Sequence, residues 1–230
     1  MIPECPVAGT SELPAGAAFW MPKPDEISEE GFSVFRDVWL IRGVRVGDAR
    51  EVIEEERRIV DVIDRLSADA DDFEEFAAIA ETGGIDDPAN ELTRDVYSAL
   101  STVLSDMPAE LGGLELGVAG LVHALASVRI LPAASCRSHP QRSWSEAPVV
   151  LFAATEFRAR ALEPLVAEAG CTFTIDPARR ELLCVRGQSI AHTMALAGLV
   201  MEHRNDFVQR RPRRVARKRR APESEQGALF

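Results

Sequence analysis

The feature that most constrains the fold is the apolar segment GLELGVAGLVHALASV at residues 113–128. Apolar side chains lie on nearly every side of the helix that it predicts, with small residues at positions 117, 119, 120 and 124. A helix without a polar face is normally buried against another layer of structure. The segment therefore predicts a helix packed on a β-sheet.

The residues after this segment supply the sheet and further helices. The segment APVVLFAAT at residues 147–155 is a continuous apolar run typical of a buried strand, and Asp176-Pro177 separates two alternating segments typical of a hairpin. Helices are expected at 156–170, ended by Gly170, and at 188–207, capped by Ser189. The order α-β-β-α-β-β-α predicts an α+β fold in which helices cover one face of a mostly antiparallel sheet.

The first half of the chain is expected to be mainly helical and acidic. Apolar residues at helical spacing predict a helix at 48–66 capped by Asp48, and two more helices are expected at 67–81 and 88–105. The predicted organisation is an irregular arm (1–24), an acidic helical region (25–110), an α/β domain (111–208) and a disordered basic tail (209–230).

Several classes of protein are not indicated by the sequence. No secretory signal and no apolar run long enough to span a bilayer are visible, so we expect a cytoplasmic protein without membrane contact. The four cysteines are scattered and are expected to be thiols. No phosphate loop, GxGxxG or GxSxG motif is present, so no cofactor is predicted.

The segment AASCRSHPQRSW, residues 133–144, is a candidate loop for chemistry. His139 could act as a base for Cys136, or Arg137 could favour the thiolate, which would make Cys136 and His139 catalytic. Alternatively, Arg137 and Arg142 could hold a phosphate together with backbone amides. Ser135 belongs to the same loop, and Ser189 opens a helix whose free amides could bind an anion.

Two other interpretations of this loop remain open. Cys-x-x-His is half of a zinc motif, and His123, Cys171 and Cys184 would complete a site only if the fold brought them together, so no metal is predicted. The other interpretation is structural. Cys136 would then be a small buried residue and His139-Pro140 would shape a turn.

The sequence SCRSH between an apolar helix and a buried strand resembles the Ser-Cys-x-Gly-His or Ser-Cys-x-Gly-Arg loops of certain small α/β domains. These include a wybutosine-synthesis family that methylates a modified guanosine in tRNA with S-adenosylmethionine, and a set of uncharacterised bacterial proteins. The resemblance covers residues 113–205 and implies a candidate ligand loop at Ser135, Cys136 and His139. Ser138 stands where the family has glycine, and the methyltransferase activity is not carried over.

The charge of the chain is unevenly distributed. Residues 210–220 contain eight basic side chains and no acid, so removing them from the formal net charge of −11 leaves −19 on the rest. Such a run predicts salt-sensitive, nonspecific contact with nucleic acid phosphates or with the protein's own acidic helices. The predicted nucleic-acid-binding residues are Arg210, Arg211, Arg213, Arg214, Arg217, Lys218, Arg219 and Arg220.

The final segment QGALF resembles the peptide with which bacterial proteins dock on the sliding clamp of DNA polymerase. The resemblance implies that Gln226 is the polar anchor and that Leu229 and Phe230 enter a hydrophobic pocket. Two apolar anchors on a short peptide are sufficient for a small hot spot in a groove.

The sequence therefore leads to a DNA-associated accessory protein, acting in repair, replication or phage defence, as the first hypothesis. One alternative is an enzyme that uses the Cys136–His139 loop on a nucleotide or RNA. A third hypothesis is a protein-interaction module whose acidic helices bind a basic partner. Neither enzymatic activity nor oligomeric state follows from the sequence.

Overall fold

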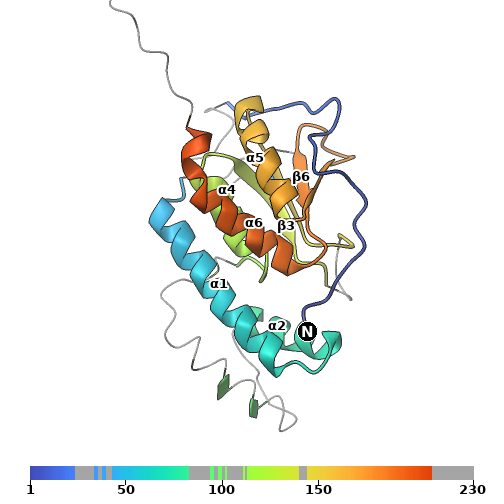
Figure 1. Cartoon of the computed structure of the whole chain (residues 1–230), viewed down its shortest axis with the longest axis vertical. Helices are drawn as coiled ribbons and strands as arrows, with labels where there is room; N and C mark the ends of the chain where they lie inside the picture. The colour runs from blue at the N-terminus through green and yellow to red at the C-terminus, as the bar shows by residue number, and fades with distance from the viewer. Residues whose placement is uncertain are drawn as a thin grey trace, which may run out of the picture.

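The computed structural model describes residues 1–23, 34–35, 38–39, 43–82, 94–95, 98–99, 102, 111, 113–139 and 144–208. The chain folds into a mixed α+β structure, as the sequence predicted (Figure 1). Its described helices are α1 (Val46–Leu66), α2 (Ala70–Thr82), α4 (Ala119–Ser127), α5 (Glu156–Glu168), α6 (Ile190–Glu202) and the 3-10 helix η2 (Arg204–Phe207).

The central sheet has four antiparallel strands. They are β3 (Leu131–Cys136), β4 (Val149–Ala153), β5 (Thr172–Ile175) and β6 (Leu183–Arg186), in the spatial order β3-β4-β6-β5. Two short paired strands, β1 (Val34–Phe35) and β2 (Val38–Trp39), form a separate ribbon. From α4 onward the element order is the predicted α-β-β-α-β-β-α, and the predicted hairpin is β5–β6.

Both faces of the sheet are buried. Alternate strand residues such as Val150, Phe152 and Val185 join the main hydrophobic core with α4, α5 and α6. The opposite alternation places Cys136, Val149 and Leu151 in a second cluster, against which Trp20 and Met21 of the arm pack. This two-sided burial explains why β4 is apolar at every position rather than alternating.

Helices α1 and α2 are continuous with this core. Ala49 and Ile53 of α1 belong to the same cluster as the sheet and α4. Further along α1, Ile59 and Ile63 pack with α2 and with the start of α6. The predicted helical region and the predicted α/β domain therefore share buried surface, and α1 extends from α6 toward α2 (Figure 1).

The arm at residues 1–23 is held to the body by main-chain contacts. The Phe173 amide donates to Thr10 O at 2.7 Å, which adds a single bridge to the edge strand β5. The Cys5 amide donates to Gln188 O, and the Leu13 amide donates to Glu163 Oε1. Phe19 packs on the main core. Because these contacts span its length, the arm covers part of the body, along the right of Figure 1.

Three local expectations differ from the structure. Helix α4 begins only at Ala119, because Gly117 turns the chain with φ at 81°. Helix α1 begins at Val46, so Asp48 lies in its first turn rather than at its cap. Ser189 makes no capping hydrogen bond to the start of α6. The predicted helix at 88–105 lies mostly outside the described residues. Among the described helices, none has the length and apolarity needed to cross a membrane.

Candidate functional site

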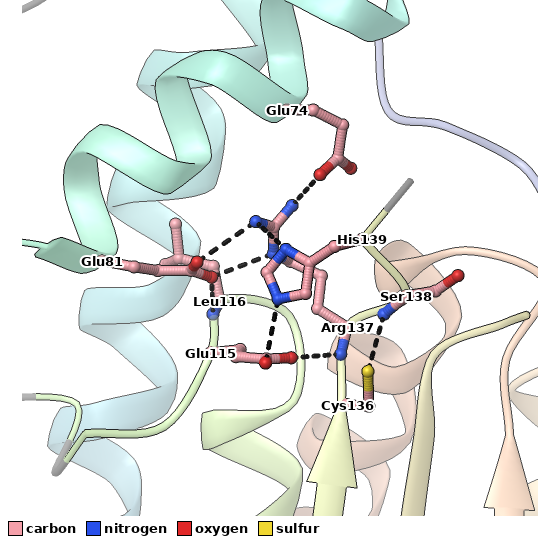
Figure 2. Close-up of polar contacts among 8 residues, drawn as sticks. All are labelled: Glu74, Glu81, Glu115, Leu116, Cys136, Arg137, Ser138 and His139. Atoms are coloured by element: carbon pink, nitrogen blue, oxygen red, sulfur yellow. Dashed lines mark hydrogen bonds and ion pairs between the residues drawn. The ribbon is translucent and has the colours of Figure 1, made fainter. Parts of the chain in front are cut away.

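The centre of the candidate site is the buried guanidinium group of Arg137, directly after β3. Its Nε donates to Glu81 Oε1 at 2.9 Å and one Nη2 hydrogen bond reaches Glu81 Oε2 at 3.1 Å, so the two groups form a bidentate pair. Its Nη1 forms an ion pair with Glu74. Both glutamates lie on α2, seven residues apart and therefore on one side of the helix (Figure 2).

A second layer of contacts extends this ionic cluster, which consists of Glu74, Glu81, Glu115, Arg137 and His139. Glu115 Oε2 accepts from the Arg137 amide at 2.5 Å, and its Oε1 lies 2.9 Å from His139 Nε2. Glu81 Oε1 also accepts from the Leu116 amide at 2.8 Å. The ionic cluster thus joins α2, the segment before α4 and the end of β3.

The contacts of His139 assign its tautomer. Nδ1 lies 2.9 Å from Arg137 Nη2, which can only donate, so Nδ1 accepts. Nε2 then carries the proton that points to the Glu115 carboxylate. Both ring nitrogens are therefore engaged within the ionic cluster, and the lone pair that a general base would use already accepts from Arg137.

In the ionic cluster, burial and neighbouring charges shift the pKa of Glu74 and Arg137 in opposite directions. Burial raises the pKa of Glu74, and the nearby Arg137 offsets this only in part. Burial acts to lower the pKa of Arg137, but Glu81 and Glu74 outweigh it and the net pKa is raised. Arg137 is 2% exposed and stays charged. A phosphate at Arg137 would have to displace these carboxylates, because four of its five N–H groups already have partners.

Cys136 lies on the other side of the strand from this cluster of charges. Its side chain is 1% exposed and packs in the second hydrophobic cluster with Leu131, Val149 and Cys184. The Ser138 amide donates to its Sγ at 3.4 Å. Cys136 and Arg137 lie on opposite sides because consecutive side chains along a strand point to opposite faces of the sheet. The surroundings of Cys136 are those of a packed core thiol.

Ser138 gives the loop its shape. Its φ of 73° lies in the left-handed region that glycine adopts more readily than serine. This turn follows β3 directly and brings His139 back beside Arg137, as Figure 2 shows. The backbone at position 138 therefore has the conformation that favours glycine, the residue found there in the Ser-Cys-x-Gly-His loops.

The other predicted site residues are not gathered at this loop. Ser135 is half-buried within β3, opposite Val150. The Ser189 hydroxyl lies 2.9 Å from His192 Nδ1 in the first turn of α6. Arg142, all eight basic residues of 210–220, Gln226, Leu229 and Phe230 lie outside the described residues.

The candidate zinc ligands occupy separate places. His123 Nδ1 contacts Ala119 O within α4. Burial raises the pKa of the thiols of Cys171 and Cys184 to about 12, so both are neutral near pH 7. Within the described ranges, no three His, Cys, Asp or Glu side chains come together in a way that could hold a metal.

Sequence reasoning missed Glu74, Glu81 and Glu115, the carboxylates of the ionic cluster. The spacing of Glu74 and Glu81 on one helix side was the available signal, but an acidic helix side is usually solvated. Their function became apparent only when the fold placed a buried arginine beside them. Chemically, the ionic cluster is a set of mutually paired charges that connects α2 to the end of β3.

Comparisons with protein-family models, with curated proteins and with solved structures found no match to this chain. The resemblances of SCRSH and QGALF therefore stay predictions.

Proposed function

We propose that this protein is a DNA-associated accessory protein whose folded body is held to DNA by the basic segment at residues 210–220. The observation that carries the proposal is the separation of charge: eight basic side chains in eleven residues, against −19 on the remainder. Arginines that reach DNA phosphates release counterions, which makes the contact strong at low salt and independent of base sequence. Repair, replication and phage defence are the cytoplasmic processes in which such a tether would act.

The sliding clamp is the proposed partner of the last residues. Gln226, Leu229 and Phe230 match the polar anchor and the apolar pair of the bacterial clamp-binding peptide. A clamp encircles DNA, so a basic run a few residues before the peptide would meet the duplex that the clamp holds. The two contacts would reinforce each other because the second becomes intramolecular once the first has formed.

The geometry of the ionic cluster favours this proposal over an enzyme built on the Cys136–His139 loop. Catalysis by that pair needs a free lone pair on His139 and an accessible thiol. In the structure Arg137 and Glu115 engage both ring nitrogens, and Cys136 is 1% exposed. An enzymatic role would require the ionic cluster to open first.

Binding of the full chain to duplex DNA and to a bacterial sliding clamp tests the proposal. Replacing all eight basic residues of 210–220 by Gln, here named the tail variant, should lower DNA affinity at 50 mM salt by about a thousandfold or more. Leu229→Ala with Phe230→Ala should abolish clamp binding, because both apolar anchors are lost.

The matched control changes Gly227 to Ala and Ala228 to Ser, the two variable positions of the peptide, and should retain clamp binding. DNA affinity that is the same in the tail variant and the wild type would refute the DNA tether. A wild-type chain that does not bind the clamp would show that QGALF matches the peptide by coincidence.

A further inference from the structure

Arg129 and Arg158 lie at one end of the sheet, in two different turns. Arg129 follows α4 and is exposed, and Arg158 belongs to the first turn of α5. The register of the sheet pairs Leu131 at the start of β3 with Ala153 at the end of β4. The turn before β3 and the turn after β4 therefore lie at the same sheet end, which brings the two arginines together.

These two arginines have no acidic partner among the described residues. The Nε atom of Arg158 is buried and lacks a hydrogen-bond acceptor. Burial lowers the pKa of Arg158, and the charge of Arg129 lowers it further. An anion bound between the two guanidinium groups would offset their mutual repulsion and accept from the unsatisfied donor.

Two acids on the neighbouring elements α5 and η2 are already paired. Glu156 forms an ion pair with Arg160 at 2.9 Å, and Asp206 lies 3.4 Å from His203 Nδ1. Neither acid is therefore left to neutralise the arginine pair. A phosphate suits two guanidinium groups, because its oxygens can accept hydrogen bonds from each planar group in a fork geometry.

The arginine pair lies at the end of the body that holds the last described residues, 204–208. Ser127 at the end of α4 donates to Met201 Sδ near the end of α6, so both helices end at the same side. The next element, η2, packs against α5 and ends at Phe207, three residues before the basic run. In Figure 1 the end of the red helix lies at the same end of the molecule as the upper part of α5.

We propose that Arg129 and Arg158 form a phosphate-binding site of the folded body, which holds the DNA backbone beside the start of the basic segment. This inference rests on the proposed function and deepens it, because it assigns a DNA contact to the otherwise acidic body. The site fixes the orientation of the body on the duplex, whereas the basic segment alone would leave it free to rotate.

Duplex DNA affinity of the full chain, measured over a range of salt concentrations, tests the site. Arg129→Gln with Arg158→Gln removes both charges but keeps most of each aliphatic stem. The slope of log affinity against log salt should become shallower by about two, since each lost phosphate contact removes about 0.9. Arg129→Lys with Arg158→Lys should keep most of the wild-type slope, because the charges remain.

A matched control removes two arginines from the other end of the body, through Arg58→Gln and Arg65→Gln on α1. It changes the net charge equally and should leave the slope unchanged. Loss of binding in the tail variant together with a wild-type slope in the Arg129/Arg158 variant would overturn this inference alone. Unchanged binding in the tail variant would overturn the proposed function itself. Thermal unfolding of each variant distinguishes loss of a contact from loss of the fold.

Discussion

At the scale of single residues, Glu56 on α1 shows how strongly position decides chemistry. Its carboxyl group is 1% exposed, Oε2 accepts from the Gly120 amide at 3.1 Å, and Oε1 has no hydrogen-bond partner among the described residues. Burial raises its pKa from 4.5 to about 7, although backbone amides at the start of α4 and Arg57 lower it in part. Between about pH 4.5 and 7, the folded protein therefore holds a proton at Glu56 that the unfolded chain releases.

This proton uptake predicts a pH-dependent stability that Glu56→Gln removes. Because the pKa is higher in the folded state, the contribution of Glu56 is fully present below about pH 4.5 and is lost as the pH rises through about 7. The full change amounts to about 3 kcal/mol. Urea unfolding between pH 5 and 8 should show a flatter pH profile for the variant than for the wild type. Parallel profiles would mean that Glu56 is ionised in the folded protein.

At the scale of secondary-structure elements, the start of α4 is set by its crossing with α6. Gly117 has a φ of 81°, and a Cβ atom there would overlap the Ile190 side chain. Thr193 Oγ1 donates to Gly117 O, so α6 holds this turn directly. The close approach, rather than helix propensity, makes the helix begin at Ala119 instead of at residue 113. Only glycine satisfies both the left-handed conformation and the contact.

Replacing Gly113 and Gly117 by alanine distinguishes the cost of the left-handed conformation from the cost of the overlap with Ile190. Gly113 also has a left-handed φ, of 74°, but nothing lies within 4 Å of an added Cβ. Gly113→Ala should therefore cost only the conformational penalty of about 1–2 kcal/mol. Gly117→Ala should cost a further ~1–3 kcal/mol, because α6 must shift to relieve the overlap. Denaturant unfolding of both variants measures the difference, and equal losses would show that the α4–α6 crossing has room for a methyl group.

At the scale of the whole molecule, the ionic cluster joins the helical part of the chain to the sheet. Its hydrogen bonds connect Arg137 to Glu81 and Glu74, which precede it in the sequence by 56 and 63 positions. The core is continuous along α1, but α2 reaches the end of β3 through Glu74 and Glu81. A buried ion pair contributes little net stability compared with apolar packing, but removing one partner leaves charges buried without compensation.

Arg137→Met should therefore destabilise the fold by about 3–5 kcal/mol and loosen α2 first. Hydrogen exchange should quicken in residues 70–82 and 113–116 more than in α4 or the sheet. The control Arg160→Met breaks the exposed pair with Glu156 and should cost less than about 0.5 kcal/mol. Unchanged exchange in α2 would show that apolar contacts alone hold this helix in place.

The sequence by itself determined the identity and order of the elements from α4 to α6. The apolar run of β4, the alternation on either side of Asp176-Pro177 and the helical spacing along α1 are local patterns, and local patterns report burial directly. For the same reason the α+β class and the antiparallel hairpin followed without knowledge of the fold.

Only the tertiary structure decided what the polar residues do. Arg137 was predicted as a phosphate ligand, yet its partners are carboxylates from a distant helix. His139 was a candidate base for Cys136, yet alternation along β3 and the turn at Ser138 direct the thiol and the imidazole to different surroundings. The physical reason is the sequence distance over which each feature is set. Apolar periodicity is a property of one helix or strand, whereas the pairing of charges depends on which elements approach each other in space.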